Sequence, residues 1–191
     1  TLDIENGSTI SSDDDWRQRL DGLGSSITTN LNGGTIDLVD EVLFDLYSGA
    51  AQTDNQIIMT FNNSPTINCD GINSGDWTKG SITNNSSFQS NFIYDGSNSQ
   101  DLPNNSNMKF YNVIVDNSST LQLASNFPVS QLLGDLDIRA GATFNDNGFT
   151  LDVTDDIINA GALNLSGTTT ANDLTNSGVS ATFTQSASKS L

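Results

Sequence analysis

The sequence contains no histidine and a single cysteine, Cys69. Histidine is the commonest general base and the commonest transition-metal ligand, and one thiol can build neither a cysteine-based zinc site nor an internal disulfide. These absences exclude most enzyme templates, so we expect no enzymatic activity and assign no catalytic, cofactor-binding or metal-ligating residue. We expect Cys69 to be a small buried hydrophobic residue.

Basic residues are also scarce, with 6 Lys and Arg against 23 Asp and Glu, which gives a formal net charge of −17. Binding to a phosphate backbone or to an anionic bilayer depends on Lys and Arg. The sequence therefore predicts no nucleic-acid partner. No run of residues approaches the ~20 apolar positions that a membrane span needs, so we also predict no membrane insertion.

The polar residues are mostly uncharged, and Asn alone occurs 24 times. Leu, Ile, Val and Phe together make 48 of 191 residues; that quarter of the chain exceeds the roughly 20% typical of disordered chains. Thr suits strand surfaces and Asn and Gly suit turns, a combination typical of strand-rich extracellular proteins. We expect a folded, secreted protein.

Short bursts of alternating apolar and polar residues dominate the pattern, and this period of two predicts strands with one face inward. They lie at 35–39, 113–115, 121–123, 136–138, 151–153 and 163–165. Residues 40–47 also favour a strand. The exception is 12–24, where Ser12 can cap a helix, three Asp residues suit its first turn and Gly24 can end it. We predict a short helix there, which favours a helix-start role for Asp13, Asp14 and Asp15 over a cation site.

Glycines at 134, 148 and 161 recur at a nearly constant interval, each before a short alternating segment. We interpret this interval as the period of a coil. Residues 94–102 also match residues 183–191 in their aromatic, serine and leucine positions, which predicts an array that continues beyond residue 191.

The predicted fold is an all-β, right-handed parallel β-helix with a short N-terminal helix, and an antiparallel β-sandwich is the alternative. The predicted strands are too short and too closely spaced for a typical sandwich. We divide the chain into a less regular capping section at 1–60 and a solenoid section at 61–191. The residues expected to face inward are Leu136, Ile138, Leu151, Val153, Leu163 and Leu165.

A few residues suggest chemistry. The pair Asp155 and Asp156 suggests the acidic pairs of polysaccharide hydrolases, although a surface role is favoured. Together with Asp152 and the segment 145–148, the pair also offers oxygen ligands for calcium, although the Asn-Asp-Asn-Gly sequence at 145–148 favours a turn. If the protein binds carbohydrate, Trp16, Trp77 and Tyr94 would be the aromatic platforms on which sugars stack, but burial is the commoner fate of such side chains.

The order of motifs over about residues 90–191 resembles the β-strand-repeat regions of type IX-secreted cell-surface adhesins of gliding Bacteroidota. The motifs lie at 92–102, 110–117, 134–153 and 158–163. The resemblance implies a parallel β-helical stalk with a spacer or adhesive role and no catalytic residues. Asp155 and Asp156 depart from it, because a glycine usually occurs there.

These observations lead us to expect a non-enzymatic section of an extracellular, cell-surface adhesin. Its partners would be a polysaccharide or other substratum, neighbouring repeats, or copies of itself. A subunit of a self-assembling filament is the first alternative function, and a carbohydrate-binding or carbohydrate-degrading β-helix is the second. We expect no cofactor and leave calcium as an open alternative.

Overall fold

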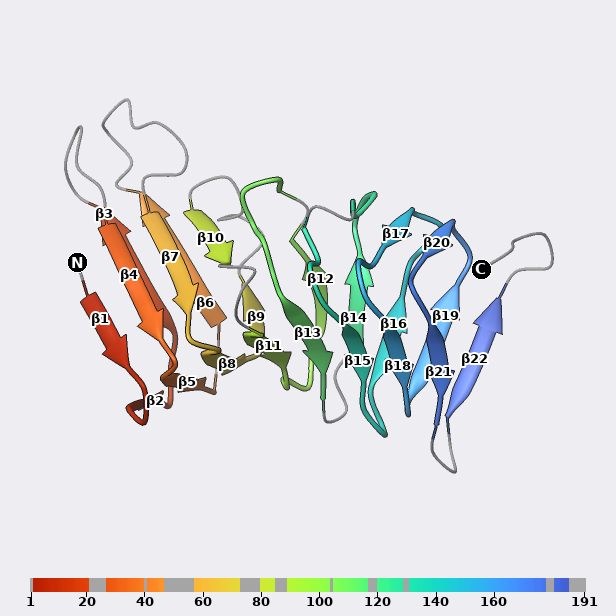
Figure 1. The fold of residues 1–191 in the computed structure, drawn as a ribbon, viewed down its shortest axis with the longest axis horizontal. Coiled ribbons are helices and arrows are strands. Elements are labelled where there is room, and N and C mark those ends of the chain that lie inside the picture. The colour runs from red at the N-terminus through yellow and green to blue at the C-terminus, as the bar shows by residue number, and fades with distance from the viewer. Residues whose placement is uncertain are drawn as a thin grey trace.

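A computed structural model describes residues 2–20, 27–39, 41–46, 57–72, 80–84, 89–103, 105–116, 120–128, 131–177 and 181–185. These residues form a β-solenoid in which the chain circles one long axis, and we call each circuit a rung (Figure 1). The described residues contain strands, turns and bends but no helix. Every pairing between two named strands is parallel. The predicted parallel solenoid is thus confirmed, and the antiparallel sandwich is wrong.

The strands lie on three faces of the rod. The first face holds a sheet of β1 (Leu2–Glu5), β4 (Ile27–Asn32), β7 (Ile57–Asn62) and β10 (Gly80–Asn84). Further along this face, isolated bridges link Ile82 to Met108, Phe110 to Leu132 and Phe127 to Leu151. Leu151 belongs to β17 (Leu151–Asp152), which pairs with β20 (Thr169–Thr170).

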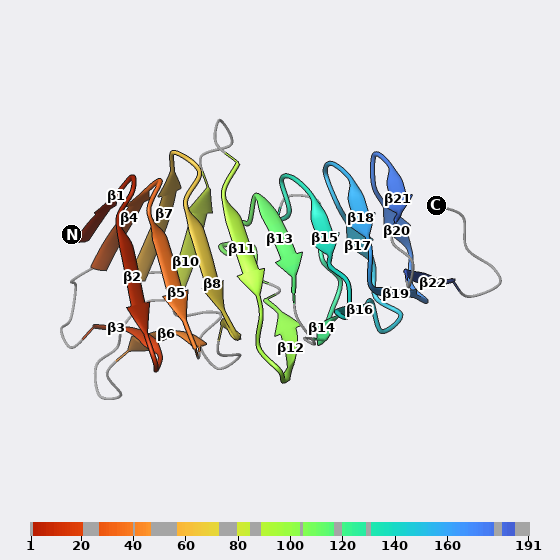
Figure 2. The ribbon, with the colours of Figure 1, turned by 90° about the horizontal axis from the view of Figure 1, so that it is seen from below.

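The second face is one eight-stranded sheet along the whole rod (Figure 2). Its strands in order are β2 (Thr9–Ser12), β5 (Thr35–Leu38), β8 (Thr66–Cys69), β11 (Asn91–Tyr94), β13 (Asn112–Val115), β15 (Leu136–Ile138), β18 (Ile157–Asn159) and β21 (Leu174–Asn176). Since consecutive rungs each contribute one strand, this sheet sets the register of the whole molecule.

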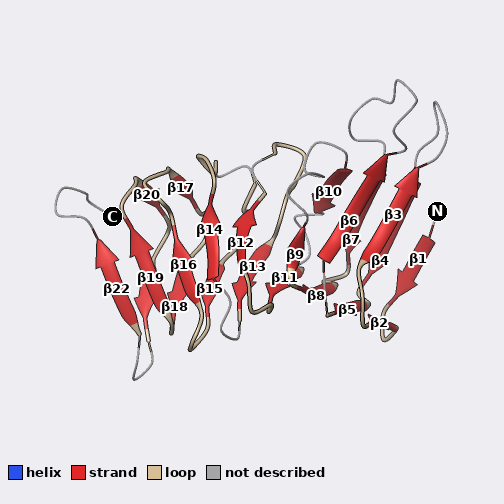
Figure 3. Cartoon of the chain, turned by 180° about the vertical axis from the view of Figure 1, so that it is seen from behind, coloured by secondary structure: helices blue, strands red, loops and turns tan. Residues whose placement is uncertain are grey.

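The third face is seen from behind in Figure 3. Its first sheet contains β3 (Trp16–Leu20), β6 (Glu41–Leu46) and β9 (Gly71–Ile72). Its second contains β12 (Ser99–Leu102), β14 (Thr120–Leu123), β16 (Thr143–Asn145), β19 (Ala162–Leu165) and β22 (Thr182–Gln185).

Inward side chains of successive rungs stack into continuous apolar rows. On the second face one row runs through Ile36, Ile67, Phe92, Val113, Leu136 and Ile157. All of these side chains are 0–1% exposed. The six residues predicted to face inward are buried as well, and so is Cys69. Period-two alternation therefore located the core, because each strand has one face against it.

The glycine spacing does not give the coil period. Leu136 pairs with Ile157 on the next rung, and not with Leu151. Gly134 and Gly148 precede strands on different faces of one rung, so the interval between them measures the distance between corners. The rungs are longer than this interval and vary in length: Thr35 pairs with Thr66 near the start of the chain, and Ile157 with the much closer Leu174 near its end.

The longer repeat is not a structural repeat either. Tyr94 lies on β11 of the second face, whereas Phe183 lies on β22 of the third face. Residues 186–191, which carry the rest of that match, lie outside the described residues.

The predicted helix at 12–24 is wrong over its described part. Residues 16–20 form β3 and pair with β6 along their full length. The acidic residues before β3 form a turn and a bond to the next rung: Asp14 N–H donates to Ser12 Oγ at 3.2 Å, and Glu41 N–H on the next rung donates to Asp15 Oδ1 at 3.2 Å. The capping signals in this segment favour a helix, but pairing of β3 with β6 on the next rung gives the backbone N–H and C=O groups their hydrogen-bond partners instead. Residues 21–24 lie outside the described chain.

One other local prediction is confirmed. The ambiguous segment at 40–47 contains strand β6. The described parts of residues 1–60 supply β1 to β6 and the start of β7, and these strands pair within the sheets given above. The described residues of this section therefore belong to solenoid rungs.

Candidate functional site

Polar ladders cover the outside of the rod. Carboxylates on one rung accept hydrogen bonds from amides on the next: Asn30 Nδ2 donates to Asp3 at 2.6 Å and Gln122 Nε2 to Asp101 at 2.8 Å. Asn68 Nδ2 similarly donates to Asp37 at 3.0 Å. Amide-to-amide steps continue the pattern. These are Asn62 to Asn32, Asn112 to Asn91 and Asn164 to Asn145. In these rows an amide side chain, and not a second acid, lies next to each carboxylate. The rungs can therefore stack in register despite the large negative charge of the chain.

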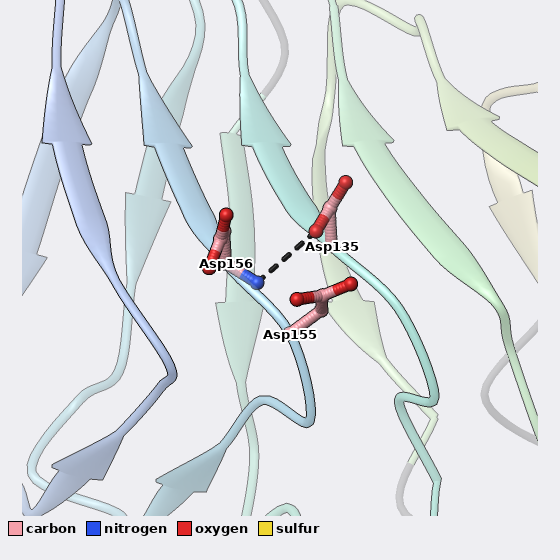
Figure 4. Close-up of side chains that lie close together, drawn as sticks. All are labelled: Asp135, Asp155 and Asp156. Carbon is pink, nitrogen blue, oxygen red and sulfur yellow. Dashed lines mark hydrogen bonds between the residues drawn. The ribbon is translucent and has the colours of Figure 1, made fainter.

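Three carboxylates lie close together without an amide between them, and they form the strongest candidate metal site among the described residues. Asp135 and Asp156 directly precede Leu136 and Ile157, whose pairing places the two acids side by side. Asp155 completes the group, and one carboxylate oxygen from each residue lies within 4.8 Å of the others (Figure 4). Carboxylate oxygens at this separation could hold a hard divalent cation.

The same cluster is also held by the protein itself. Asp156 N–H donates to Asp135 Oδ1 at 3.0 Å, and Asn172 Nδ2 donates to Asp156 Oδ1 at 2.9 Å. Asp155 is exposed, whereas the other two are half-buried. The cluster includes the predicted pair and adds Asp135, which only the register of the sheet reveals. The third predicted ligand, Asp152, lies instead on β17 and accepts a hydrogen bond from Thr170 Oγ1.

We expect neutralisation of Asp155 to stabilise the protein without metal. Like charges on adjacent strands repel, so Asp155→Asn should raise the free energy of unfolding by about 0.2–1 kcal/mol at low salt. The gain should shrink as salt screens the carboxylates. Urea unfolding measures it, with Asp13→Asn as a control for an exposed acid outside the cluster.

If the cluster bound calcium, Asp155→Asn would destabilise the calcium-loaded protein, because it would remove a ligand. We expect the melting temperature to be the same with calcium and with a chelator. A calcium-dependent rise that Asp155→Asn abolishes would identify the cluster as a calcium site and contradict a purely structural role.

The second predicted calcium segment, 145–148, is a structural turn. Asp146 is 0% exposed, and its carboxylate accepts N–H bonds from Ser166 at 2.8 Å and Gly167 at 2.7 Å on the next rung. It also accepts a bond from Gly148 N–H at 3.0 Å. Asn147 and Gly148 have φ values of 51° and 85°, a left-handed backbone that Asn and Gly adopt at least cost. The turn reading of this sequence is confirmed, and Asp146 joins two rungs.

A shallow acidic groove lies at the corner after the second face. Asp37, Asp70 and Asp95 line it together with Val39, which is 67% exposed, and its volume is about 350 Å³. The carboxylate of Asp70 lies over Gly96, where an added Cβ would come within 1.7 Å of Asp70 Oδ1. A side chain at residue 96 would therefore displace the carboxylate of Asp70.

Burial shifts the titration of two acids on this face. The pKa of Asp95 is raised by burial and by the nearby charges of Asp70 and Asp37, against a hydrogen bond from Asn68. Burial likewise raises the pKa of Asp137, and Arg139 opposes this effect. In the folded state both groups therefore hold their protons to higher pH than in the unfolded chain.

This shift predicts a solenoid that becomes more stable as pH falls from neutrality. A folded state that binds more protons than the unfolded state gains stability as pH falls through the raised pKa, down to the ordinary carboxyl value. Asp95→Asn should raise stability at neutral pH and flatten this dependence. Urea unfolding across the acid range tests it, with exposed Asp173→Asn as the control. A pH dependence unchanged by Asp95→Asn would contradict the assignment.

The proposed aromatic platform is wrong for Tyr94. Its side chain is 0% exposed and packs against Phe92, with ring centroids 5.1 Å apart. Trp16 is partly buried against the core, and Trp77 lies outside the described residues. Tyr94 thus belongs to the core.

Fold and surface together define a parallel β-solenoid with a polar, hydrogen-bonded exterior. Comparison with known proteins adds nothing further, because the chain matches no protein-family model, no curated protein and no solved structure. Among the described residues, no helix has the length and apolar character needed to cross a membrane.

Proposed function

We propose that this chain is a non-enzymatic spacer and adhesive stalk of an extracellular cell-surface protein. The observation that carries the proposal is the combination of a continuous apolar core with polar ladders on successive rungs. Such a rod holds what it carries at a distance from its point of attachment. Repeated amide and hydroxyl groups along the rod offer many weak hydrogen-bonding contacts, and simultaneous contacts raise the overall affinity for a repetitive partner.

Several finer features of the proposal rest on the sequence. A right-handed coil is expected because crossovers between parallel strands are almost always right-handed. Type IX secretion and a Bacteroidota adhesin as parent protein are proposed from the order of motifs at 92–163. Polysaccharide at a cell surface or substratum is the proposed partner, since sugar hydroxyls pair well with amide and carboxylate rows.

The absence of histidine from the sequence and the setting of the acidic cluster support a non-enzymatic role. A glycosidase needs one carboxyl that holds a proton and a second that acts as base or nucleophile. In the cluster, Asp156 accepts an amide hydrogen bond and Asp135 accepts a backbone N–H. Both carboxylates thus serve as hydrogen-bond acceptors between rungs, which suits structure better than acid catalysis.

Adhesion should depend on valency. Beads coated densely with the chain should bind polysaccharide surfaces, whereas the free chain should bind at least about a hundredfold more weakly. Beads coated with heat-unfolded chain are the control, because the unfolded chain keeps the amino-acid composition but loses the polar ladders. Tight binding by the free chain would contradict the proposal, and so would release of shortened sugar chains.

A further inference from the structure

The third face carries an outward surface without charged side chains. No residue of β14, β16, β19 or β22 is charged, although the chain contains 23 Asp and Glu. These four strands lie side by side in one sheet (Figure 3). Their outward side chains form two rows, one of Gln122, Asn145, Asn164 and Thr184 and one of Thr120, Thr143, Ala162 and Thr182. Successive rungs thus present a neutral polar surface on a strongly acidic chain.

A small recess lies in this surface beside the amide row. It is lined by Asn145, Asn147, Asn164, Leu165, Ser166 and Thr184, and its volume is about 130 Å³. All of these residues except Leu165 are polar, and none is charged. Pockets for whole small-molecule ligands are larger, roughly 300–1,000 Å³. The recess therefore fits the edge of one unit of a longer chain better than a separate small ligand.

The amide pair in the recess can both donate and accept hydrogen bonds. Asn164 Nδ2 donates to Asn145 Oδ1 at 2.7 Å. That bond engages neither Asn145 Nδ2 nor Asn164 Oδ1, so a donor and an acceptor stay within reach of a ligand on the outward side. A sugar hydroxyl is itself a donor and an acceptor, so it matches this pair.

Other polar groups of the recess are held in place by the fold. Asn147 Nδ2 donates to Leu123 O at 3.0 Å on the preceding rung. Ser166 donates to the buried carboxylate of Asp146 from its backbone N–H at 2.8 Å and from its hydroxyl at 2.9 Å. Side chains that are already fixed lose less conformational entropy when a ligand binds. The recess is therefore preorganised.

We propose that this recess and the neutral rows bind a linear polysaccharide of uncharged hexoses, which lies along the rod across successive rungs. The inference rests on the proposed stalk function and names the face that binds and the class of sugar. Rungs lie about 4.8 Å apart, close to the length of one hexose in an extended chain, so neighbouring sugars meet equivalent side chains. A polymer of uronates does not fit, because a chain of net charge −17 repels its carboxylates and these four strands offer it no cation.

Amide signals in the NMR spectrum of the unmodified, labelled chain test the location. Linear oligomers of glucose, mannose and galactose are added in turn, with a galacturonate oligomer as the anionic counterpart. We expect at least one neutral oligomer to shift the signals of Asn145, Asn164 and Ser166, and not those of Asn32 and Asn62 on the first face. The shifts should persist at high salt, because no charge is involved. No shift with any neutral oligomer, or larger shifts with galacturonate, would overturn the inference.

A double variant tests the amide pair in the bead assay. Asn145→Ala combined with Asn164→Ala removes both partners of one hydrogen bond, so neither is left unsatisfied. Beads coated with this variant should bind the neutral polysaccharide at least about tenfold more weakly than beads with the unmodified chain. Asn32→Ala combined with Asn62→Ala is the matched control, since it removes a bonded amide pair from the first face and should leave binding unchanged.

The outcomes separate this inference from the stalk function. If the two double variants bind alike, the inference fails and the adhesive stalk stands. If beads with the unmodified chain bind no polysaccharide, the adhesive function itself fails. Circular dichroism shows whether each variant is folded, and the NMR measurement on the unmodified chain decides the matter if Asn145→Ala with Asn164→Ala is not.

Discussion

Replacing Gly167 by alanine should lower the free energy of unfolding by about 3 kcal/mol, although the change adds one methyl group. A Cβ at this position would lie 1.8 Å from the backbone oxygen of Phe149 on the preceding rung. A backbone atom cannot rotate away as a side chain can, so the rungs must separate. The glycine permits the closest approach of two rungs at this corner.

Urea unfolding followed by circular dichroism measures this effect. Thr168→Ala is the matched control, because Thr168 is the exposed next residue. We expect the control to stay within about 0.5 kcal/mol of the unmodified chain. If the two variants unfolded alike, the spacing of the rungs at this corner would be wrong.

Replacing Asp146 by alanine should cost about 4 kcal/mol, because each buried donor left without a partner costs ~1–3 kcal/mol. The carboxylate binds the N–H groups of Ser166 and Gly167 on the next rung and of Gly148 on its own. Asp146→Asn, which keeps one acceptor oxygen, should lie between the alanine variant and the unmodified chain.

Asp152→Ala is the matched control for this loss. Asp152 is half-buried and accepts a hydrogen bond from the Thr170 hydroxyl, so its removal should cost no more than about 1 kcal/mol. Hydrogen exchange gives a second measurement, since the amides of Ser166 and Gly167 should lose protection in Asp146→Ala first. Equal stability of Asp146→Ala and Asp152→Ala would show that Asp146 does not join the rungs.

The sequence predicted the strands and the core because both depend on local alternation. Leu163 and Leu165 are apolar and inward, and the intervening Asn164 is outward and bonds to Asn145. The parallel solenoid also followed from strand length and turn spacing. Each of these features depends on a short segment of the chain, so it can be predicted without knowing which strands pair.

The register itself could not be read from the sequence. Rungs vary in length, and the regular glycines mark corners, so their spacing pointed to the wrong strand partner. The acidic cluster follows from register in the same way, because Asp135 and Asp156 belong to different rungs and meet only when Leu136 pairs with Ile157. The error at 12–24 has the same origin, since pairing of β3 with β6 outweighs the local helix signals.

Contacts between backbone amides in the NMR spectrum of the labelled protein test the central claim, which is the parallel stacking of rungs in this register. The account predicts cross-peaks that connect the β13, β15 and β18 strands in order, with Leu136 beside both Val113 and Ile157. Cross-peaks that place Leu136 beside Leu151, or that show antiparallel partners, would contradict it.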